Sequence, residues 1–361
     1  MLNLKKVILY LFVLFFTALT LTLFVNKKTY KNNKNIENLY PNFSEKLNNI
    51  SRINIKSEQT SYDLAKKNDR WVVPEYEDYP VDLKKINNLL LEISGLKLIE
   101  KKTSNPEYFE KLGINIPIGN NKNSKVIRVY GVKEQLLYSF IIGNKSKVSS
   151  SQNLFYIRRE SDEQAWLFVN RMNIYDNSFE WVDRRLFKFG RWRIKNFKVI
   201  DHKKKQNNFY IYRDNYSDNG FKLHNLPKNQ KVKKPLEVHS IVSTIERIVI
   251  KNVLKKSSIN KKKIIRSIEI VMFDGQTITI DILEHKNKKL LSAIVKSNIS
   301  LRKDLPEEGP VIVGLPEMPS EVDIEQEDLR YRFLNQWLYE IDESSLNNLL
   351  IDKIDLINKI I

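Results

Sequence analysis

The first clear pattern along the chain is an uninterrupted apolar run near the N-terminus. Residues Val7 to Val25 read VILYLFVLFFTALTLTLFV and contain no charged residue, proline or glycine. At about 1.5 Å per residue, a helix of this length spans about 29 Å, which matches the hydrocarbon core of a bilayer. A signal peptide has a shorter apolar stretch and a small-residue cleavage site. The run therefore predicts that residues 1–25 form a short tail and a retained single-pass transmembrane anchor.

The lysines around this run give opposing indications of its orientation. Lys5 and Lys6 precede the helix, and Lys27, Lys28, Lys31 and Lys34 follow it, so a simple lysine count would keep the body in the cytoplasm. Long domains translocate largely regardless of such charges, however, and a tail of six residues usually stays inside. We expect a body on the extracytoplasmic side of the inner membrane.

Alternation and helical periodicity then predict an α+β body. Residues 26–51 are a polar tether and entry segment. Ile53 and Ile55 alternate with polar neighbours, as do Tyr62 and Leu64, which predicts a hairpin. From Asp82 the apolar period becomes three to four, which predicts a helix with Asp82 as its cap and Gly95 near its end. Further predicted strands cover 126–130, 136–142, 154–158 and 166–169, and a short helix covers 174–182.

The second half repeats this order of elements. Alternating strands around Phe197 and Phe209 precede a helix over 238–248, whose apolar residues lie about 152 positions after those of the first helix. Strands over 268–271, 277–282, 329–333 and 337–341 follow, with Asp274 and Gly275 as turn residues, and a helix over 344–361 closes the chain. The recurring order predicts an ancient duplication, with repeats at 52–187 and 188–361, each a mainly antiparallel sheet with packed helices.

The second repeat contains a proline-rich loop that the first lacks. Residues 305–322 read LPEEGPVIVGLPEMPSEV, and their four prolines forbid regular helix or central strand. One interpretation is a segment docked on its own domain; the other is an arm that binds a partner. Under the second interpretation the partner-binding residues are Pro310, Val311, Ile312, Val313 and Pro316.

Composition and charge change this picture little. The net charge is +18, but Lys, Asn and Ile are all abundant together, so an AT-rich genome can explain the lysines. Residues 301–361 reverse the sign, with 6 Lys/Arg against 14 Asp/Glu. The runs at 203–205 and 261–263 lack interleaved aromatic residues, which argues against nucleic acid as a partner.

No motif for catalysis, metal binding or cofactor binding is present. The absence of cysteine excludes disulfides and thiol chemistry, and the four histidines show no metal-ligand spacing. The glycines form neither GxGxxG nor a phosphate loop, and no serine lies in a GxSxG elbow. Asp183 before Arg184 and Arg185 is interpreted as a structural ion pair at the joint between the repeats. The sequence therefore predicts a protein without enzymatic activity, metal or cofactor.

The chain resembles a bacterial family known only as domain of unknown function 4340. The resemblance covers nearly the whole chain and is carried by Leu39, Tyr40 and Pro41, Ile53 and Ile55, Asp69, Arg70 and Trp71, Asp82, Ile86, Leu112, Gly113 and Pro117, Tyr156, Trp181, Asp183 and Arg184, and Trp337 to Glu340. It implies a membrane-anchored extracytoplasmic protein, with some members associated with auxiliary parts of ABC transport systems similar to those of gliding motility. It implies no catalytic residues.

Together these observations predict a binding or scaffolding component of an envelope complex. Its partners would be the lipid bilayer, through Val7 to Val25, and other proteins of the membrane complex. A hydrolase acting on cell-wall or lipid substrates is the alternative.

Overall fold

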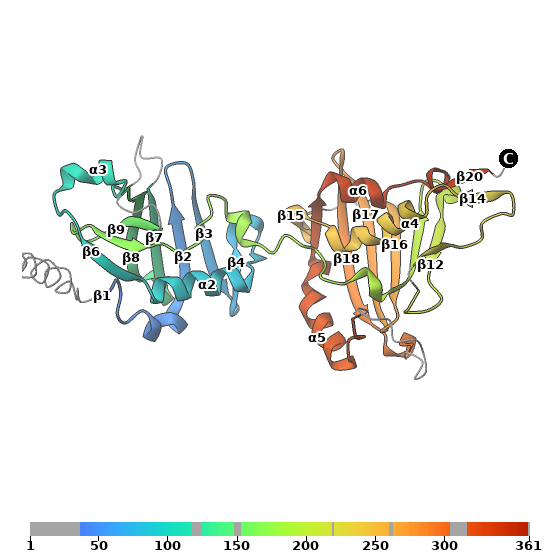
Figure 1. The fold of residues 1–361 in the computed structure, drawn as a ribbon, viewed down its shortest axis with the longest axis horizontal. Helices are drawn as coiled ribbons and strands as arrows, with labels where there is room; N and C mark the ends of the chain where they lie inside the picture. Colours follow the sequence, from blue (N-terminus) through green and yellow to red (C-terminus); the bar gives the residue numbers. More distant parts are fainter. Residues whose placement is uncertain are drawn as a thin grey trace, which may run out of the picture. The chain divides into compact units, whose positions relative to one another are not determined.

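The chain folds into two compact units (Figure 1). Unit 1 comprises Met1–Val72 and Val81–Ser178, and unit 2 comprises Val73–Pro80 and Phe179–Ile361. The structure is a computed structural model that describes residues 37–116, 124–147, 153–218, 220–259, 263–303 and 316–359. The predicted anchor over residues 7–25 lies outside these ranges. Within them, no helix has the length and apolar character needed to cross a membrane.

An antiparallel sheet with strand order β1-β6-β10-β9-β8-β7-β2-β3-β4 forms the centre of unit 1, and the short strand β5 lies in the segment Val73–Pro80, which belongs to unit 2. Ile53 and Ile55 of β2 are paired with Leu64 and Tyr62 of β3, and all four side chains are buried, which confirms the predicted hairpin. The strand bounds are Glu37–Asn38 (β1), Ile50–Lys56 (β2), Ser61–Lys67 (β3), Arg70–Val73 (β4), Tyr79–Pro80 (β5), Lys97–Lys101 (β6), Lys125–Gly131 (β7), Leu136–Lys145 (β8), Leu154–Arg159 (β9) and Trp166–Val169 (β10).

The predicted helix is α2, Leu83–Ser94, which lies across one face of this sheet (Figure 1). The Asp82 side chain accepts a hydrogen bond from the backbone N–H of Lys84 at 2.9 Å, so Asp82 is the helix cap. Ile86, Leu89 and Ile93 are buried at helical spacing, which holds α2 against the sheet.

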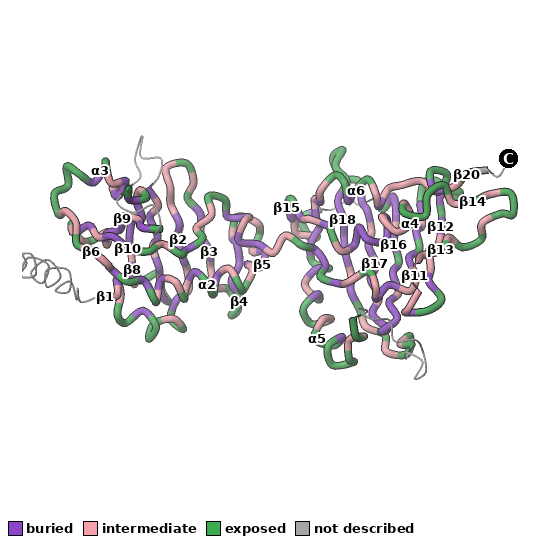
Figure 2. The backbone as a smooth tube through the Cα atoms, in the orientation of Figure 1, coloured by how far each residue is buried: buried purple, intermediate pink, exposed green. Residues whose placement is uncertain are grey.

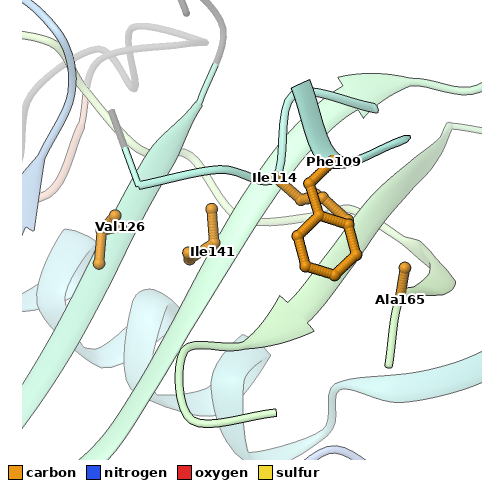
Figure 3. Close-up of a cluster of buried hydrophobic side chains, with 5 residues drawn as sticks. All are labelled: Phe109, Ile114, Val126, Ile141 and Ala165. Carbon is orange, nitrogen blue, oxygen red and sulfur yellow. The ribbon is translucent and has the colours of Figure 1, made fainter. Parts of the chain in front are cut away.

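A second apolar cluster covers the other face of the same sheet. Phe109 from α3, Phe109–Leu112, packs with Ile114, Val126, Ile141 and Ala165 (Figure 3). Because neighbouring residues of a strand point to opposite faces, this cluster lies across the sheet from the α2 side. The central strands are therefore buried on both faces, as the purple stretches of β7 and β8 indicate (Figure 2).

Unit 2 contains an antiparallel sheet of strand order β13-β12-β11-β16-β17-β18-β19-β15, and a separate pair, β14-β20. The strand bounds are Ile194–Asp201 (β11), Phe209–Tyr212 (β12), Lys222–Leu223 (β13), Gln230–Val232 (β14), Ile250–Lys255 (β15), Lys263–Met272 (β16), Gln276–His285 (β17), Lys288–Ser297 (β18), Trp337–Ile341 (β19) and Ile357–Lys359 (β20). Its helices are α4, Pro235–Ser243, α5, Glu321–Tyr331, and α6, Glu343–Leu349. Helices α4 and α6 contact each other over the sheet, and α5 packs along β18 (Figure 1).

The two sheets share one strand order. From the strand that follows the helix, unit 1 reads β6-β10-β9-β8-β7-β2-β3-β4, and unit 2 reads β15-β19-β18-β17-β16-β11-β12-β13. In chain order, the helix of each unit follows the first three of these strands, β2 to β4 or β11 to β13, and precedes β6 or β15. Mainly antiparallel sheets with few helices make the fold α+β, as the sequence predicted.

Several predicted elements differ from the observed ones. Residues 174–182 contain only a 3-10 turn at Ser178–Trp181 rather than a helix. Residues 329–333 are not a strand, because they belong to the end of α5 and the following 3-10 turn. The closing helix stops at Leu349, and the chain then pairs with β14 as β20. Strands β15 and β18 were not predicted.

The chain passes from unit 1 to unit 2 after Ser178, whereas the sequence placed the end of the first repeat at residue 187. Arg185 forms an isolated antiparallel bridge with Val249, and the N–H of Leu186 donates to the carbonyl oxygen of Ile248 at 3.1 Å. These backbone hydrogen bonds explain why residues 179–187 pack as part of unit 2.

Candidate functional site

The predicted partner-binding residues lie in the connection between β18 and α5. Pro310, Val311, Ile312 and Val313 fall outside the described residues. Pro316 is described and exposed, and its carbonyl oxygen accepts a hydrogen bond from the Tyr216 hydroxyl at 2.7 Å. The structure therefore locates one of the five residues and fixes its backbone to unit 2.

Both described ends of this connection are held by hydrogen bonds. The N–H of Lys303 donates to the carbonyl oxygen of Phe273 at 2.8 Å, and Nη1 of Arg302 donates to the carbonyl oxygen of Pro319 at 2.9 Å. Burial raises the pKa of Tyr216 to about 12, so its hydroxyl keeps the proton that it donates to Pro316 at neutral pH. The connection therefore starts and ends at fixed positions on one unit.

A tight turn between β16 and β17 supports the first of these ends. Gly275 has φ +90°, and a Cβ at this position would lie 2.5 Å from the carbonyl oxygen of Asn298. The N–H of Asn298 donates to the carbonyl oxygen of Gly275 at 2.8 Å. Only glycine fits this close approach, which confirms the predicted turn at Asp274 and Gly275.

Helix α5 follows the connection and presents two exposed apolar side chains. Its capping box is Ser320 with Asp323, each side chain bonding the backbone N–H of the other. Ile324 is fully buried, whereas Val322 and Leu329 are 63% and 62% exposed. Residues seven apart lie on the same side of a helix, so these two side chains share one side of α5, with Glu325 and Gln326 on the turn between them. We call Val322 and Leu329 the exposed apolar stripe.

A buried ionic network fixes α5 to the sheet. Nε of Arg193 donates to Asp274 at 2.5 Å, Nη1 donates to Glu327 at 2.9 Å, and Nη2 donates to Gln276 at 3.1 Å. The side chains of Arg193 and Asp274 are 3% and 0% exposed, and that of Glu327 is 20% exposed. We call these four residues the Arg193 network.

The Arg193 network has a structural role. A buried charge that loses its partner is strongly destabilising, so each member requires the others. The network joins residues far apart in sequence, and a neighbouring hydrogen bond from the N–H of Ser297 to Asp328 at 2.7 Å links α5 to β18. The exposed apolar stripe therefore lies on a helix with a fixed position.

The histidines do not gather into a metal site. Among the described residues, no group of three or more His, Asp or Glu side chains could hold a metal ion. His202 Nε2 lies 2.9 Å from the Ser267 hydroxyl, which donates to Asp281 at 2.6 Å. In a serine hydrolase the histidine takes the serine proton. Here that proton is directed to the carboxylate, so this chain of side chains differs from a catalytic triad.

The predicted ion pair around Asp183 is formed with different partners. Asp183 pairs with Lys188, and Arg184 pairs with Glu180 at 3.0 Å. Nε of Arg184 also donates to the carbonyl oxygen of Ile250 at 3.3 Å. Asp183 and Arg184 therefore form structural ion pairs, as the sequence predicted, but their partners are Lys188 and Glu180 rather than each other.

Sequence reasoning missed the Arg193 network and α5. Arg193 and Glu327 lie 134 positions apart, and no local pattern connects them. Helix α5 had a usable signal, since Ser320 and Asp323 have the spacing of a capping box immediately before Ile324.

Comparison with known proteins identifies a family without a known activity. A family model described as a domain of unknown function, DUF4340, matches residues 71–264. The matched segment starts in β4 and ends in β16. No curated protein and no solved structure matches the chain.

Proposed function

This chain belongs to the family described as domain of unknown function 4340, and from that premise we propose that it is a non-enzymatic, membrane-anchored binding or scaffolding component of an envelope complex. Residues 7–25 hold it in the inner membrane as a single-pass protein. Its body lies on the extracytoplasmic side, beside an ABC-type transporter. The two units derive from one ancestral repeat, a proposal supported by their common strand order.

The observation that carries this proposal is the exposed apolar stripe of α5, Val322 and Leu329. Apolar side chains on a rigid support favour protein binding, because little order is lost on docking. The Arg193 network supplies that rigidity. The partner is an apolar segment of another protein of the membrane complex, which contacts this stripe and the proline-rich loop that precedes it.

A charge substitution on the stripe tests this proposal. Leu329→Asp should leave the chain folded and in the membrane fraction, and should reduce recovery of the cross-linked partner after co-purification from native membranes. The matched control is Leu91→Asp on α2, because Leu91 is 65% exposed on a helix of unit 1. Equal recovery with both variants would remove the stripe as the docking surface.

A second experiment tests the loop separately. Deletion of residues 307–315 retains Pro316 and Pro319, whose carbonyl oxygens are bonded to Tyr216 and Arg302. We expect the deleted chain to have the thermal unfolding temperature of the parent but to lose the partner. A large loss of thermal stability would instead assign the loop to packing on its own unit.

Membrane topology needs its own measurement. Reporter fusions after residue 60 should be active outside the cytoplasm and inactive within it. Activity restricted to the cytoplasm would mean that the lysines after the apolar run determine the orientation.

The alternative function is hydrolysis of cell-wall or lipid substrates. Ser267→Ala tests whether this hydroxyl, which lies between His202 and Asp281, takes part in hydrolysis although its proton is directed to the carboxylate. The binding proposal expects unchanged partner recovery and no change in envelope hydrolysis, whereas a loss of hydrolysis would favour the enzyme.

A further inference from the structure

An open hollow in unit 2 lies beside α4. Its volume is about 360 Å³, within the range of small-molecule sites. Two arginines line it, Arg191 just before β11 and Arg247 in the 3-10 turn after α4. Ser240, Ser243 and His239 of α4 add further polar groups to the lining.

Both guanidinium groups of this hollow keep unused donors. Arg191 Nη1 donates to the Ser243 hydroxyl at 3.2 Å, and Arg247 Nη2 reaches the Ser240 carbonyl oxygen at 3.5 Å. Among the described residues, neither guanidinium forms an ion pair with a carboxylate. Arg193 and Arg266 of the same unit, by contrast, are each paired with buried aspartates.

A third arginine nearby adds positive charge without competing for a ligand. Arg213 gives its donors to the backbone carbonyl oxygens of Trp192, Ile194, Tyr216 and Asp218. Burial lowers the pKa of Arg213 to about 10, and the positive charge of Arg191 contributes in the same direction. The arginine therefore stays charged at neutral pH and contributes to the positive potential near the hollow.

His239 is an additional donor. Its Nε2 accepts a hydrogen bond from the N–H of Phe221 at 3.4 Å, so the neutral ring carries its proton on Nδ1. Burial first, and then Arg191 and Arg213, lower the pKa of His239, which keeps the ring neutral at pH 7. The ring can thus donate one hydrogen bond without adding a charge.

One carboxylate also lines the hollow. Glu246 accepts a hydrogen bond from the backbone N–H of Arg191, which directs one of its oxygens to the main chain. With two arginines, one glutamate and a neutral histidine, the lining has a formal charge of about +1. Leu236, which is 80% exposed, supplies an apolar edge.

We propose that this hollow binds a phosphate group that carries a terminal, doubly ionisable PO₃, as inorganic phosphate and phosphate monoesters do. Guanidinium groups bind such oxyanions through two parallel hydrogen bonds, and a phosphate offers more acceptor oxygens than a carboxylate to the donors of Arg191, Arg247, Ser240 and His239. The phosphate is either free in solution or the headgroup of a lipid, whose chains would contact Leu236. Both sources share the chemistry of the site.

The test is calorimetric titration of the full-length chain in nonionic detergent with inorganic phosphate and with dihexanoyl phosphatidic acid. Arg191→Gln and Arg247→Gln should each weaken phosphate binding roughly tenfold, because each removes a charge-assisted hydrogen bond. Glu246→Gln keeps an acceptor for the Arg191 N–H and removes the negative charge, so it should strengthen binding. The matched control is Arg330→Gln, which changes an exposed arginine of α5.

The two ligands identify the source of the phosphate. Tighter binding of phosphatidic acid than of inorganic phosphate, with the gain lost in Leu236→Ser, assigns a lipid headgroup; equal affinities assign free phosphate. Absence of phosphate binding overturns the proposal. So does an equal weakening by Arg330→Gln, or unchanged affinity in Arg191→Gln and Arg247→Gln when both fold with parental circular dichroism spectra.

Discussion

Replacement of Arg193 by methionine tests the ionic network that holds α5. The substitution keeps the apolar length of the side chain and removes the guanidinium from Asp274, which is 0% exposed, and from Glu327, which is 20% exposed. Breaking a buried ion pair by removing one partner costs about 3 to 5 kcal/mol, because the remaining charge is left unpaired. Glu327 can turn toward water, so most of this loss in the free energy of unfolding comes from Asp274.

The measurement is hydrogen exchange of peptides from β17 and β18 in increasing urea, which reports the opening free energy of this sheet without assuming that the two units unfold together. The matched control is Arg52→Met in unit 1. Arg52 pairs with Asp63 and Glu134, whose side chains are 38% and 65% exposed, so its loss should cost less than about 1 kcal/mol.

A double variant separates charge from packing. Arg193→Met with Asp274→Asn retains the acceptor for the N–H of Gln276 and removes the unpaired charge, so it should recover at least half of the lost free energy. A cost below about 1 kcal/mol for the single variant would refute the reasoning. A double variant as unstable as the single one would assign the loss to packing.

Three further changes have predictable effects on stability. Burial acts to raise the pKa of Asp201, but the hydrogen bond from Arg266 and two backbone N–H groups overcome it and lower the pKa to about 2, from 3.8. The ionised Asp201 therefore stabilises the fold above about pH 4, and this stabilisation is lost as the pH falls toward 2. In Asp201→Asn, the free energy of unfolding, followed by circular dichroism, should depend less on pH between about 4 and 2. Gly275→Ala should lower the free energy of unfolding by about 1 to 3 kcal/mol, because Gly275 has a positive φ and a Cβ would clash with Asn298. Gly95→Ala should change the free energy of unfolding by less than about 1 kcal/mol, and equal effects of the two substitutions in thermal unfolding would contradict the turn geometry. Asp82→Ala should cost about 1 kcal/mol through loss of the α2 cap, seen as faster exchange of the first-turn amides, and unchanged exchange would exclude the cap.

The sequence alone determined the elements whose patterns are local. Alternation in β2 and β3 predicted a hairpin because each strand buries one face at these positions, with Ile53 opposite Leu64. The spacing of Ile86, Leu89 and Ile93 after Asp82 predicted α2, because the capping residue and the apolar residues are separated by only a few helical turns. The family resemblance was also available at this level, and the match over residues 71–264 confirms it.

Elements without a local pattern were decided by the tertiary structure. Strand β18 contains Leu290, Leu291, Ser292 and Ala293 in succession, all buried, so neither alternation nor helical period marks it. Strand β15 is a strand because β19, almost ninety positions later, supplies its hydrogen bonds. Conversely, residues 329–333 looked like a strand, but the capping box at Ser320 starts a helix that continues into them.

The candidate sites depend most on tertiary structure. The five loop residues were chosen from sequence, yet the end of that loop is held by the hydrogen bond from Tyr216 to Pro316. Helix α5 after the loop is held by Arg193, Asp274 and Glu327, which only folding brings together. Arg191 and Arg247 likewise both line the hollow beside α4 although no motif joins them. The sequence determines which side chains lie on the same face of one helix or one strand. Which of those side chains come together is decided by the pairing of strands that are distant in the sequence and by burial, and neighbours in the chain do not determine either.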